Sequence, residues 1–291
     1  MRRTALALTA VTGLLLVACG GDDDDDAGGA TGTGANGDPA ACAEGNTLSD
    51  GQLTVATGEP AFPPYVIDDA PESGDGFEAA LAYAVADQMG FGEDQVSWAR
   101  TTFEGAVQPG PKDFDFNIQQ YSITPEREEV VSFSEPYYEA NQAILGYDDS
   151  PAADASTAAA IRDLRIGVAA GTTSLTFVTD VLQPTADPFV YNDNAAAKQA
   201  LDTQQIDAIV ADLPTALYVS GVEIEGTTVF GQFPPSEGTQ GEPWGMLFAK
   251  DSPLVECVNL ALASLRASGA LEEITTEWMS GSVNAPEIPL D

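Results

Sequence analysis

The chain has 291 residues, of which 46 are acidic and 10 are basic, and its formal net charge is -36. A chain this acidic repels nucleic acid and anionic membrane surfaces, so no nucleic-acid partner is expected. The sequence contains no histidine. This excludes Ser-His-Asp and Cys-His catalysis and histidine-ligated zinc.

The N-terminus has the pattern of a secretory signal. Arg2 and Arg3 precede an apolar run over residues 5–17, which is too short to span a bilayer comfortably, and small residues end it. The tetrapeptide Leu16-Val17-Ala18-Cys19 resembles a bacterial lipobox. The resemblance implies a signal peptide over residues 1–18, cleavage before Cys19, and a lipid on its thiol that anchors the protein to the outer face of the cell membrane. The alternative is an ordinary signal peptide followed by an unmodified cysteine.

The next segment, residues 19–46, has the composition of a disordered tether. It contains five consecutive aspartates at residues 22–26, followed by Gly, Ala, Thr and Asn, and little that can fill a core. Cys42 and Cys257 are the two cysteines besides Cys19. In an exported protein such a pair is most simply a disulfide, here joining the start of the folded region to a C-terminal helix. Two buried thiols are the alternative.

Strands and helices alternate along the rest of the chain in two blocks. Such alternation predicts two α/β lobes. The first block is predicted to contain strands at residues 52–56, 96–98 and 114–118, with helices at residues 76–89 and from residue 103 to 107. The second is predicted to contain strands at residues 165–168 and 207–211, a helix after residue 171, and helices at residues 195–201, 254–268 and 271–279.

Several short motifs occur in a specific order: Gly76-Phe77-Glu78, Ser122-Ile123-Thr124-Pro125-Glu126-Arg127, Phe133-Ser134-Glu135-Pro136-Tyr137-Tyr138, Gly171-Thr172-Thr173-Ser174, and Ala211-Asp212. In order and spacing the chain resembles, over residues 48–280, the family 3 extracellular solute-binding proteins, which are amino-acid-binding components of ABC importers. The resemblance implies an α/β, two-lobe, type II periplasmic-binding-protein-like fold whose lobes are joined by two crossing strands.

The same resemblance predicts the lobe boundaries. Lobe 1 is expected to consist of residues 47–140 and 245–291, and lobe 2 of residues 141–244. The crossings are expected near residues 139–143 and 231–245. The ligand is expected in the cleft between the lobes, which would close on it by a hinge motion.

The resemblance also assigns roles to polar residues. Arg127 is expected to hold a ligand carboxylate with its planar fork, and Ser122 to add its N–H and hydroxyl; the alternative is a surface arginine paired with Glu128 or Glu129. Thr172 and Thr173 open a helix, whose free N–H groups favour an anion, or they simply cap it. Asp212 is expected to bind the ligand ammonium, or else to cap a helix.

Phe62 and Phe103 match positions where the family places aromatic walls, with core packing as the alternative. Glu59 matches an acidic position that faces the side-chain cation in relatives that bind lysine or arginine. Gln120 is expected either to hydrogen-bond a polar ligand side chain or only to narrow the pocket, and Trp244 is a further candidate for the cleft. No cofactor or metal is expected.

These expectations favour a monomeric, non-enzymatic protein that captures an amino acid, polar or basic, and delivers it to an ABC transporter permease. Two other classes stay open. One is a cyclohexadienyl-dehydratase-like enzyme on the same fold, with Glu59 and Asp212 as its carboxylates. The other is a ligand-sensing module of a receptor.

Overall fold

A computed structural model describes residues 37–233, 241–279 and 285–290. These residues belong to one unit of the chain, Ala35–Asp291. The predicted signal peptide, Cys19 and residues 19–36 of the predicted tether lie outside the described residues.

Lobe 1 is built on a five-stranded sheet with the strand order β2-β1-β3-β12-β4. β1 pairs in parallel with β2 and β3, whereas β12 runs antiparallel to β3 and β4. Because β12 comes from near the end of the chain, lobe 1 combines both halves of the sequence. The strands are β1 (Leu53–Gly58), β2 (Val96–Thr101), β3 (Phe116–Asn117), β4 (Val131–Phe133) and β12 (Leu247–Ala249).

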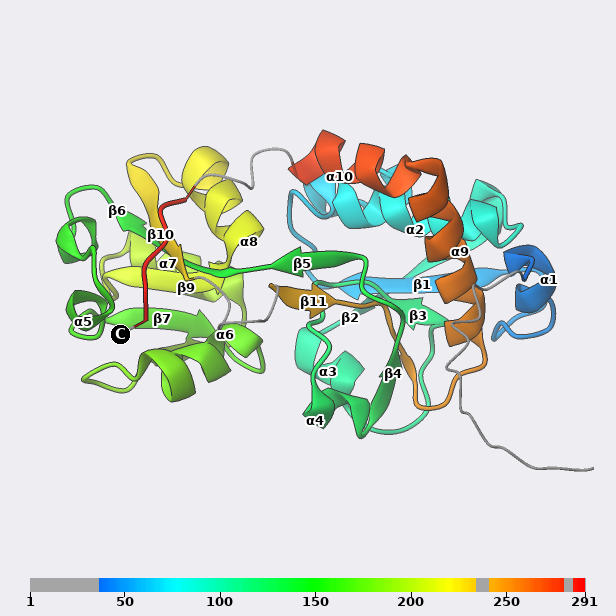
Figure 1. The fold of residues 1–291 in the computed structure, drawn as a ribbon, viewed down its shortest axis with the longest axis horizontal. Coiled ribbons are helices and arrows are strands. Elements are labelled where there is room, and N and C mark those ends of the chain that lie inside the picture. The colour runs from blue at the N-terminus through cyan, green and yellow to red at the C-terminus, as the bar shows by residue number, and fades with distance from the viewer. Residues whose placement is uncertain (1–36, 234–240, 280–284, 291) are drawn as a thin grey trace, which may run out of the picture. The chain divides into compact units, whose positions relative to one another are not determined.

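Helices cover both faces of this sheet (Figure 1). On one face, α2, α9 and α10 pack together with Leu53, Val55 and Phe248 of the sheet in the largest core cluster. On the other face, Ala106 of α3 packs with Ala56 and Leu247. The helices are α2 (Phe77–Gln88), α3 (Phe103–Val107), α4 (Pro125–Glu128), α9 (Leu254–Ser268) and α10 (Ala270–Met279), with short 3-10 turns η1 (Ile67–Asp69), η2 (Pro71–Ser73) and η3 (Glu93–Gln95).

Lobe 2 is built on a second five-stranded sheet with the order β10-β6-β9-β7-β8. β7 pairs in parallel with β8 and β9, and β6 lies antiparallel between β9 and β10. The strands are β6 (Gln142–Tyr147), β7 (Ile166–Ala169), β8 (Phe189–Tyr191), β9 (Ala208–Asp212) and β10 (Thr227–Phe233).

The lobe 2 sheet also has apolar side chains packed on both faces. Leu145 packs with α7 and α8 on one face, and Ile144 and Val210 pack with Ile161 of α5 on the other. The helices are α5 (Ala158–Ile161), α6 (Thr173–Thr176), α7 (Asn194–Asp202) and α8 (Leu213–Tyr218); α6 continues into η5 (Phe177–Leu182) and α8 into η6 (Val219–Glu223), while η4 (Pro151–Asp154) follows β6.

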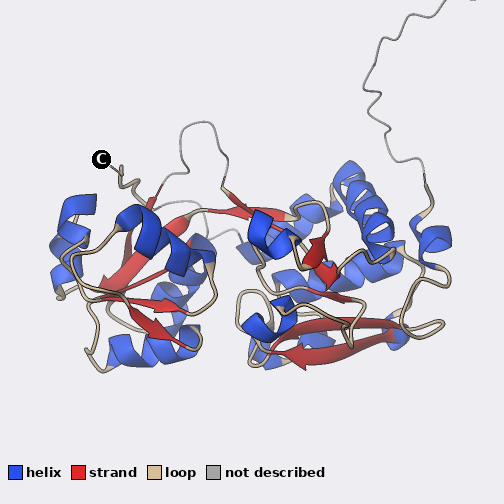
Figure 2. Ribbon diagram, turned by 90° about the horizontal axis from the view of Figure 1, so that it is seen from below, coloured by secondary structure: helices blue, strands red, loops and turns tan. Residues whose placement is uncertain are grey.

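Two strands join the lobes, as predicted (Figure 2). β5 (Tyr138–Ala140) pairs antiparallel with β11 (Glu242–Trp244), and each lies at the junction of the two lobes along the chain. β5 leads directly into β6 of lobe 2, and β11 is followed by β12 of lobe 1. The fold is therefore the two-lobe type II arrangement that the sequence predicted.

The two ends of the described chain differ from the predicted boundaries. α1 (Pro39–Ala43) already belongs to lobe 1, because the structure contains the predicted Cys42–Cys257 disulfide, with an S–S distance of 2.05 Å, and Ala43 is buried in the core. The predicted tether therefore extends too far, since its residues from 39 onward are folded.

The C-terminal residues 285–290 were expected in lobe 1, but this expectation is wrong. Glu287 bridges to Gln232 of β10, and Ile288 is only 2% exposed within the core of lobe 2. The chain therefore returns from α10 of lobe 1 to lobe 2, and in Figure 1 this red segment runs beside β10.

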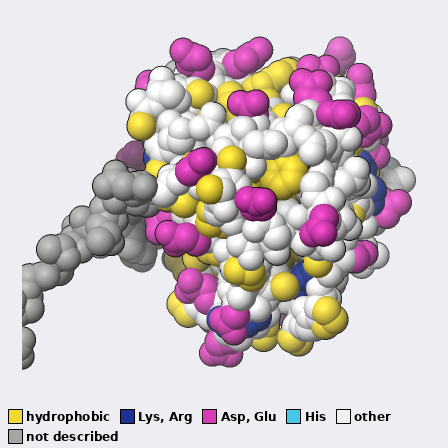
Figure 3. Space-filling model, turned by 90° about the vertical axis from the view of Figure 1, so that its right-hand side faces the viewer, with side chains coloured by type: hydrophobic (Ala, Val, Ile, Leu, Met, Phe, Trp, Pro, Cys, Tyr) yellow, Lys and Arg dark blue, Asp and Glu magenta, His cyan; other side chains and the backbone are white. Residues whose placement is uncertain are grey.

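Acidic side chains are spread over the outer face of lobe 1 and are not gathered in one patch (Figure 3). Among the described residues no single helix is long and apolar enough to cross a membrane. α9 and α10 together have such a length and composition, but the chain bends by 82° between them.

Candidate functional site

The loops after four strands meet where the lobes face each other. The carboxyl ends of β1 and β3 in lobe 1 lie opposite those of β7 and β9 in lobe 2, the position where ligand sites gather in open α/β sheets. They enclose a cavity of about 80 Å³, called here the cleft cavity. Its lining includes eight residues predicted from the sequence: Phe62, Phe103, Gln120, Ser122, Arg127, Thr172, Thr173 and Asp212.

Arg127 is held at the start of α4, where Thr124 caps the helix by accepting from the Arg127 N–H at 3.3 Å. The side chain is only 9% exposed. Its Nη1 donates to the Ser122 carbonyl at 2.7 Å, and its Nη2 donates across the cleft to the Gly171 carbonyl at 3.0 Å. The guanidinium is therefore directed into the cleft and not toward the surface acids that follow it in sequence.

An aromatic stack supports the same guanidinium. The Phe103 ring centroid lies 5.3 Å from the Arg127 Cζ and is stacked on Tyr121 at 4.6 Å. Burial lowers the pKa of Arg127, while Tyr121 and the carboxylates of Asp212 and Glu242 favour its charged form. Phe103 thus lines the cleft cavity and also fixes the cation in place.

Asp212 ends β9 on the opposite lobe. Its Oδ1 accepts from Nε2 of Gln142 at 2.8 Å, and its side chain makes no capping bond to α8. Burial and the nearby Glu242 carboxylate raise the pKa of Asp212 to about 7, against the opposing effects of the Gln142 hydrogen bond and Arg127. Asp212 therefore occupies the N-cap position of α8 without capping it through its side chain, and the carboxylate can meet a cation.

The turn from β7 into α6 brings lobe 2 against lobe 1. Gly171 has φ +70°, which favours glycine, and a Cβ there would lie 2.9 Å from Cγ of Glu104 and force that side chain to move. Thr172 caps α6 by accepting from Leu175 N at 3.2 Å, and the Thr173 hydroxyl lies 3.1 Å from that of Ser122. The capping role and the cleft position of this turn therefore coexist.

Gln120 is positioned by a buried acid that the sequence did not single out as functional. Its backbone has φ 49°, and its N–H donates to Glu78 Oε1 at 2.8 Å. Glu78 also accepts from the Gln120 side-chain amide and the Tyr137 hydroxyl. Burial raises the pKa of Glu78 to about 7, although these hydrogen bonds oppose the shift.

Two predicted positions fall outside the cleft. Glu59 is exposed and lines neither the cleft cavity nor the larger cavity described next; its N–H donates to the Thr101 carbonyl, which prolongs the β1–β2 pairing. Trp244 is 0% exposed and packs against Tyr65, at 5.7 Å between ring centroids, in the core of lobe 1.

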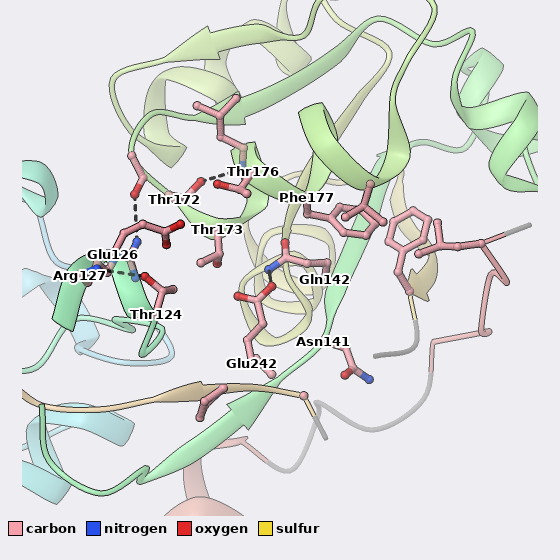
Figure 4. Close-up of a pocket in the computed structure, with 18 residues that line it drawn as sticks. Thr124, Glu126, Arg127, Asn141, Gln142, Thr172, Thr173, Thr176, Phe177 and Glu242 are labelled. Atoms are coloured by element: carbon pink, nitrogen blue, oxygen red, sulfur yellow. Dashed lines mark hydrogen bonds between the residues drawn. The ribbon is translucent and has the colours of Figure 1, made fainter. Parts of the chain in front are cut away.

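A second cavity of about 670 Å³, called here the hinge cavity, adjoins the crossing strands (Figure 4). It shares Arg127, Thr172 and Thr173 with the cleft cavity. Gln142, from the start of β6, and Glu242, from the start of β11, face each other in it, with Gln142 Nε2 donating to Glu242 Oε1 at 3.1 Å. Sequence reasoning missed both residues, although it predicted the crossings that carry them.

Glu242 also accepts from the Ser122 hydroxyl through Oε2 at 3.1 Å. The carboxylate is therefore connected to both lobes, through Ser122 of lobe 1 and Gln142 of lobe 2.

Within the described residues, no group of His, Cys, Asp or Glu side chains has an arrangement that could hold a metal ion.

A family model of the bacterial extracellular solute-binding proteins, family 3, matches residues 53–281. The chain belongs to this family. As a family 3 solute-binding protein it is 27% identical over 228 residues to the arginine-binding periplasmic protein of Mannheimia haemolytica, covering 77% of this chain and 90% of that relative.

Two solved structures support the same family assignment. An ancestral arginine-binding protein with bound arginine has a TM-score of 0.65 and 30% identity to this family 3 protein, covering 79% of this chain and 98% of the other. An ancestral amino-acid-binding protein described as a precursor of cyclohexadienyl dehydratase has a TM-score of 0.64 and 30% identity, covering 78% and 95%. These relatives are named as binding proteins.

Proposed function

We propose that the protein captures a free amino acid, polar or basic, between its lobes. The observation that carries this proposal is that Arg127 from lobe 1 and Asp212 from lobe 2 line the same cavity. A buried zwitterion needs a partner for each charge. The Arg127 fork and the Ser122 hydroxyl suit the carboxylate, and Asp212 suits the ammonium.

Because Arg127 and Asp212 lie on different lobes, closure of the cleft should depend on the ligand. A ligand that carries both charges bridges the lobes, so it binds the closed form more tightly than the open form. The arginine-binding relatives support a ligand of this class. We propose that the loaded protein, a monomer, delivers the amino acid to an ABC transporter permease.

We also propose that a lipid anchors the protein to the membrane and that the protein does not convert its ligand chemically. A lipid on Cys19 would hold the protein at the outer face of the cell membrane, with the acidic segment after it as a spacer. The ligand would leave chemically unchanged. Mass spectrometry of ligand recovered after incubation tests this point, and the release of an altered product would favour the dehydratase-like alternative.

A thermal-shift screen of the mature protein against all amino acids tests the ligand class. A ligand at a hundred times its dissociation constant stabilises the folded form by about 2.7 kcal/mol. Titration calorimetry with the ligand found should then show a loss of about a hundredfold to several thousandfold for Arg127→Ala and for Asp212→Ala, since each change leaves a buried ligand charge unpaired.

Arg100→Ala is the matched control, because Arg100 lies on β2, pairs with Asp69 and lines neither cavity. Binding by both cleft variants within about threefold of the wild type would show that the site is assigned wrongly. A screen in which no amino acid raises the unfolding temperature would contradict the proposed function itself.

A further inference from the structure

Glu242 and Asp212 are linked by a single amide. Nε2 of Gln142 donates to Asp212 Oδ1 at 2.8 Å and to Glu242 Oε1 at 3.1 Å. An amide nitrogen has two hydrogens, so one Gln142 satisfies one oxygen of each carboxylate. The arrangement brings two acids together at the junction of the cleft cavity and the hinge cavity.

The other end of the same amide lacks a partner. Gln142 is only 4% exposed, and its Oε1 is buried without a hydrogen-bond partner among the described residues. Figure 4 shows this oxygen on the side of the amide away from Glu242. Leaving a buried acceptor unpaired is costly, so the site lacks a hydrogen-bond donor that a ligand can supply.

The charges of the lining point to the same kind of ligand. Arg127 is the only cation among the described residues that line the two cavities, whereas Asp212 and Glu242 both lie near it. Asp193 also lines the cleft but already caps α7 by accepting from Ala196 N at 2.8 Å. A zwitterion brings no net charge to this excess of carboxylates, but an amino acid with a cationic side chain does.

We infer that Glu242 and the Gln142 amide oxygen form a subsite for the side-chain cation of the ligand, which selects dibasic over neutral amino acids. This inference rests on the proposed function. The zwitterion would be held between Arg127 and Asp212, and the side chain would extend into the hinge cavity. A guanidinium or ammonium group there donates a hydrogen bond to Gln142 Oε1 and gives the Glu242 carboxylate a positively charged partner.

The subsite replaces the role that the sequence assigned to Glu59. That carboxylate is exposed and lines neither cavity. Glu242 is partly buried and hydrogen-bonded from both lobes through Ser122 and Gln142. A charge held in this way is less screened by water and salt than a surface carboxylate, and therefore discriminates more strongly between charged and neutral ligands.

Calorimetric titration with L-arginine and with L-citrulline tests the subsite, because citrulline replaces the guanidinium by a neutral urea of nearly the same shape. The wild type should bind arginine more tightly. Glu242→Gln should weaken arginine binding by about tenfold or more while changing citrulline binding by less than about threefold. Glu139→Gln removes the same charge from the adjacent crossing strand at an exposed position and should change neither.

Equal wild-type affinity for arginine and citrulline overturns the inference without any variant, so a folding defect in Glu242→Gln cannot hide the result. Equal losses for both ligands in Glu242→Gln also overturn it, since they would place the carboxylate on the ammonium common to both. In each of these cases amino-acid binding itself persists, which distinguishes failure of the subsite from failure of the proposed function, where neither ligand nor any other amino acid binds.

Discussion

The raised pKa of Asp212 predicts that amino-acid binding weakens as the pH falls below neutrality. Only the ionised carboxylate can pair with a ligand ammonium. In the ligand-free protein burial and the Glu242 charge raise the pKa of Asp212 to about 7. At neutral pH the carboxyl is therefore partly protonated, and binding must release the proton.

The size of the effect follows from this pKa. If the ligand binds only the ionised form, the apparent dissociation constant exceeds that of the ionised form about elevenfold at pH 6, about twofold at pH 7 and about 1.1-fold at pH 8. We therefore expect affinity to fall about tenfold from pH 8 to pH 6. At pH 7 about half a proton is released for each ligand bound.

Titration calorimetry with arginine measures both quantities, because the guanidinium and carboxylate of arginine keep their charges between pH 6 and 8, and a separate titration of free arginine corrects for the protons that its α-ammonium loses toward pH 8. Buffers with different ionisation enthalpies report the released proton directly. Asp212→Asn should bind weakly and without pH dependence over this range. Glu78→Gln should keep the pH dependence, since Glu78 has a similarly raised pKa but lines neither cavity. Its affinity is compared only with itself at pH 6 and pH 8, because Glu78 positions Gln120 and its loss changes the affinity at any pH.

A wild-type affinity that changes less than about twofold between pH 6 and 8 would refute the reasoning. The same conclusion would follow if Asp212→Asn kept the wild-type slope, or if Glu78→Gln lost it. A flat affinity in the wild type would mean that Asp212 stays ionised in the empty cleft. A slope kept by Asp212→Asn, or lost in Glu78→Gln, would mean that a group other than Asp212 releases the proton on binding.

Unfolding of the ligand-free protein should show the opposite dependence on pH. Asp212 and Glu78 have folded-state pKa values of about 7, above the ordinary values of 3.8 and 4.5. The folded protein therefore binds more protons than the unfolded chain between these limits, and these two groups make the free energy of unfolding fall as the pH rises from about 4 to about 7. Glu78→Gln should remove part of this slope in urea titrations.

Three further outcomes are expected. Ile288→Ala should lower the free energy of unfolding by about 2–4 kcal/mol, because Ile288 is buried in lobe 2; a urea titration showing less than about 0.5 kcal/mol would contradict its core position. Replacing Cys42 and Cys257 by serine should cost about 2–5 kcal/mol, since the disulfide closes a span of 215 residues, and two freely alkylated peptides in a non-reduced digest would disprove the bond. Cys19→Ala should leave binding intact and abolish membrane retention in cell fractionation, and continued retention would exclude the lipid anchor.

The residues of the cleft cavity were predicted from the motifs that the chain shares with the family, and several of these motifs lie where strands end. Arg127, Thr172 and Asp212 each follow or close a recognisable strand or motif, and the carboxyl ends of strands are where two α/β lobes present side chains to each other. The family motifs sufficed to place these residues, because the shared fold brings strand ends together regardless of the details of packing.

The hinge cavity could not be predicted in the same way. Gln142 and Glu242 are 100 positions apart in the sequence, and only the pairing of β5 with β11 brings their side chains to 3.1 Å. Neither residue belongs to a motif. Glu59 shows the converse error, since its sequence position matched an acidic site but its backbone continues the β1–β2 pairing and leaves the side chain in solvent.

The C-terminal segment was assigned to the wrong lobe for a related reason. Residues 285–290 contain no helical or strand periodicity, so sequence position alone suggested that they stay with α10 in lobe 1. Their place is decided by contacts: Gln232 donates to the Ala285 carbonyl at 2.9 Å, and Ile288 occupies the lobe 2 core. The chain thus connects the lobes a third time, after both crossing strands.

The composition of the cleft explains why closure should depend on the ligand. Without ligand, the described contacts between the lobes include three short polar ones, from Arg127 to Gly171, Ser122 to Thr173 and Tyr65 to Thr215. Two carboxylates, Asp212 and Glu242, also approach each other there, and burial together with this repulsion raises the pKa of Asp212. Polar contacts of this kind each contribute only about 1 kcal/mol net, so the repulsion opposes weak interactions that hold the empty cleft shut. A bound cation turns that repulsion into attraction, and this difference between the empty and the occupied cleft is the free energy that can drive the hinge.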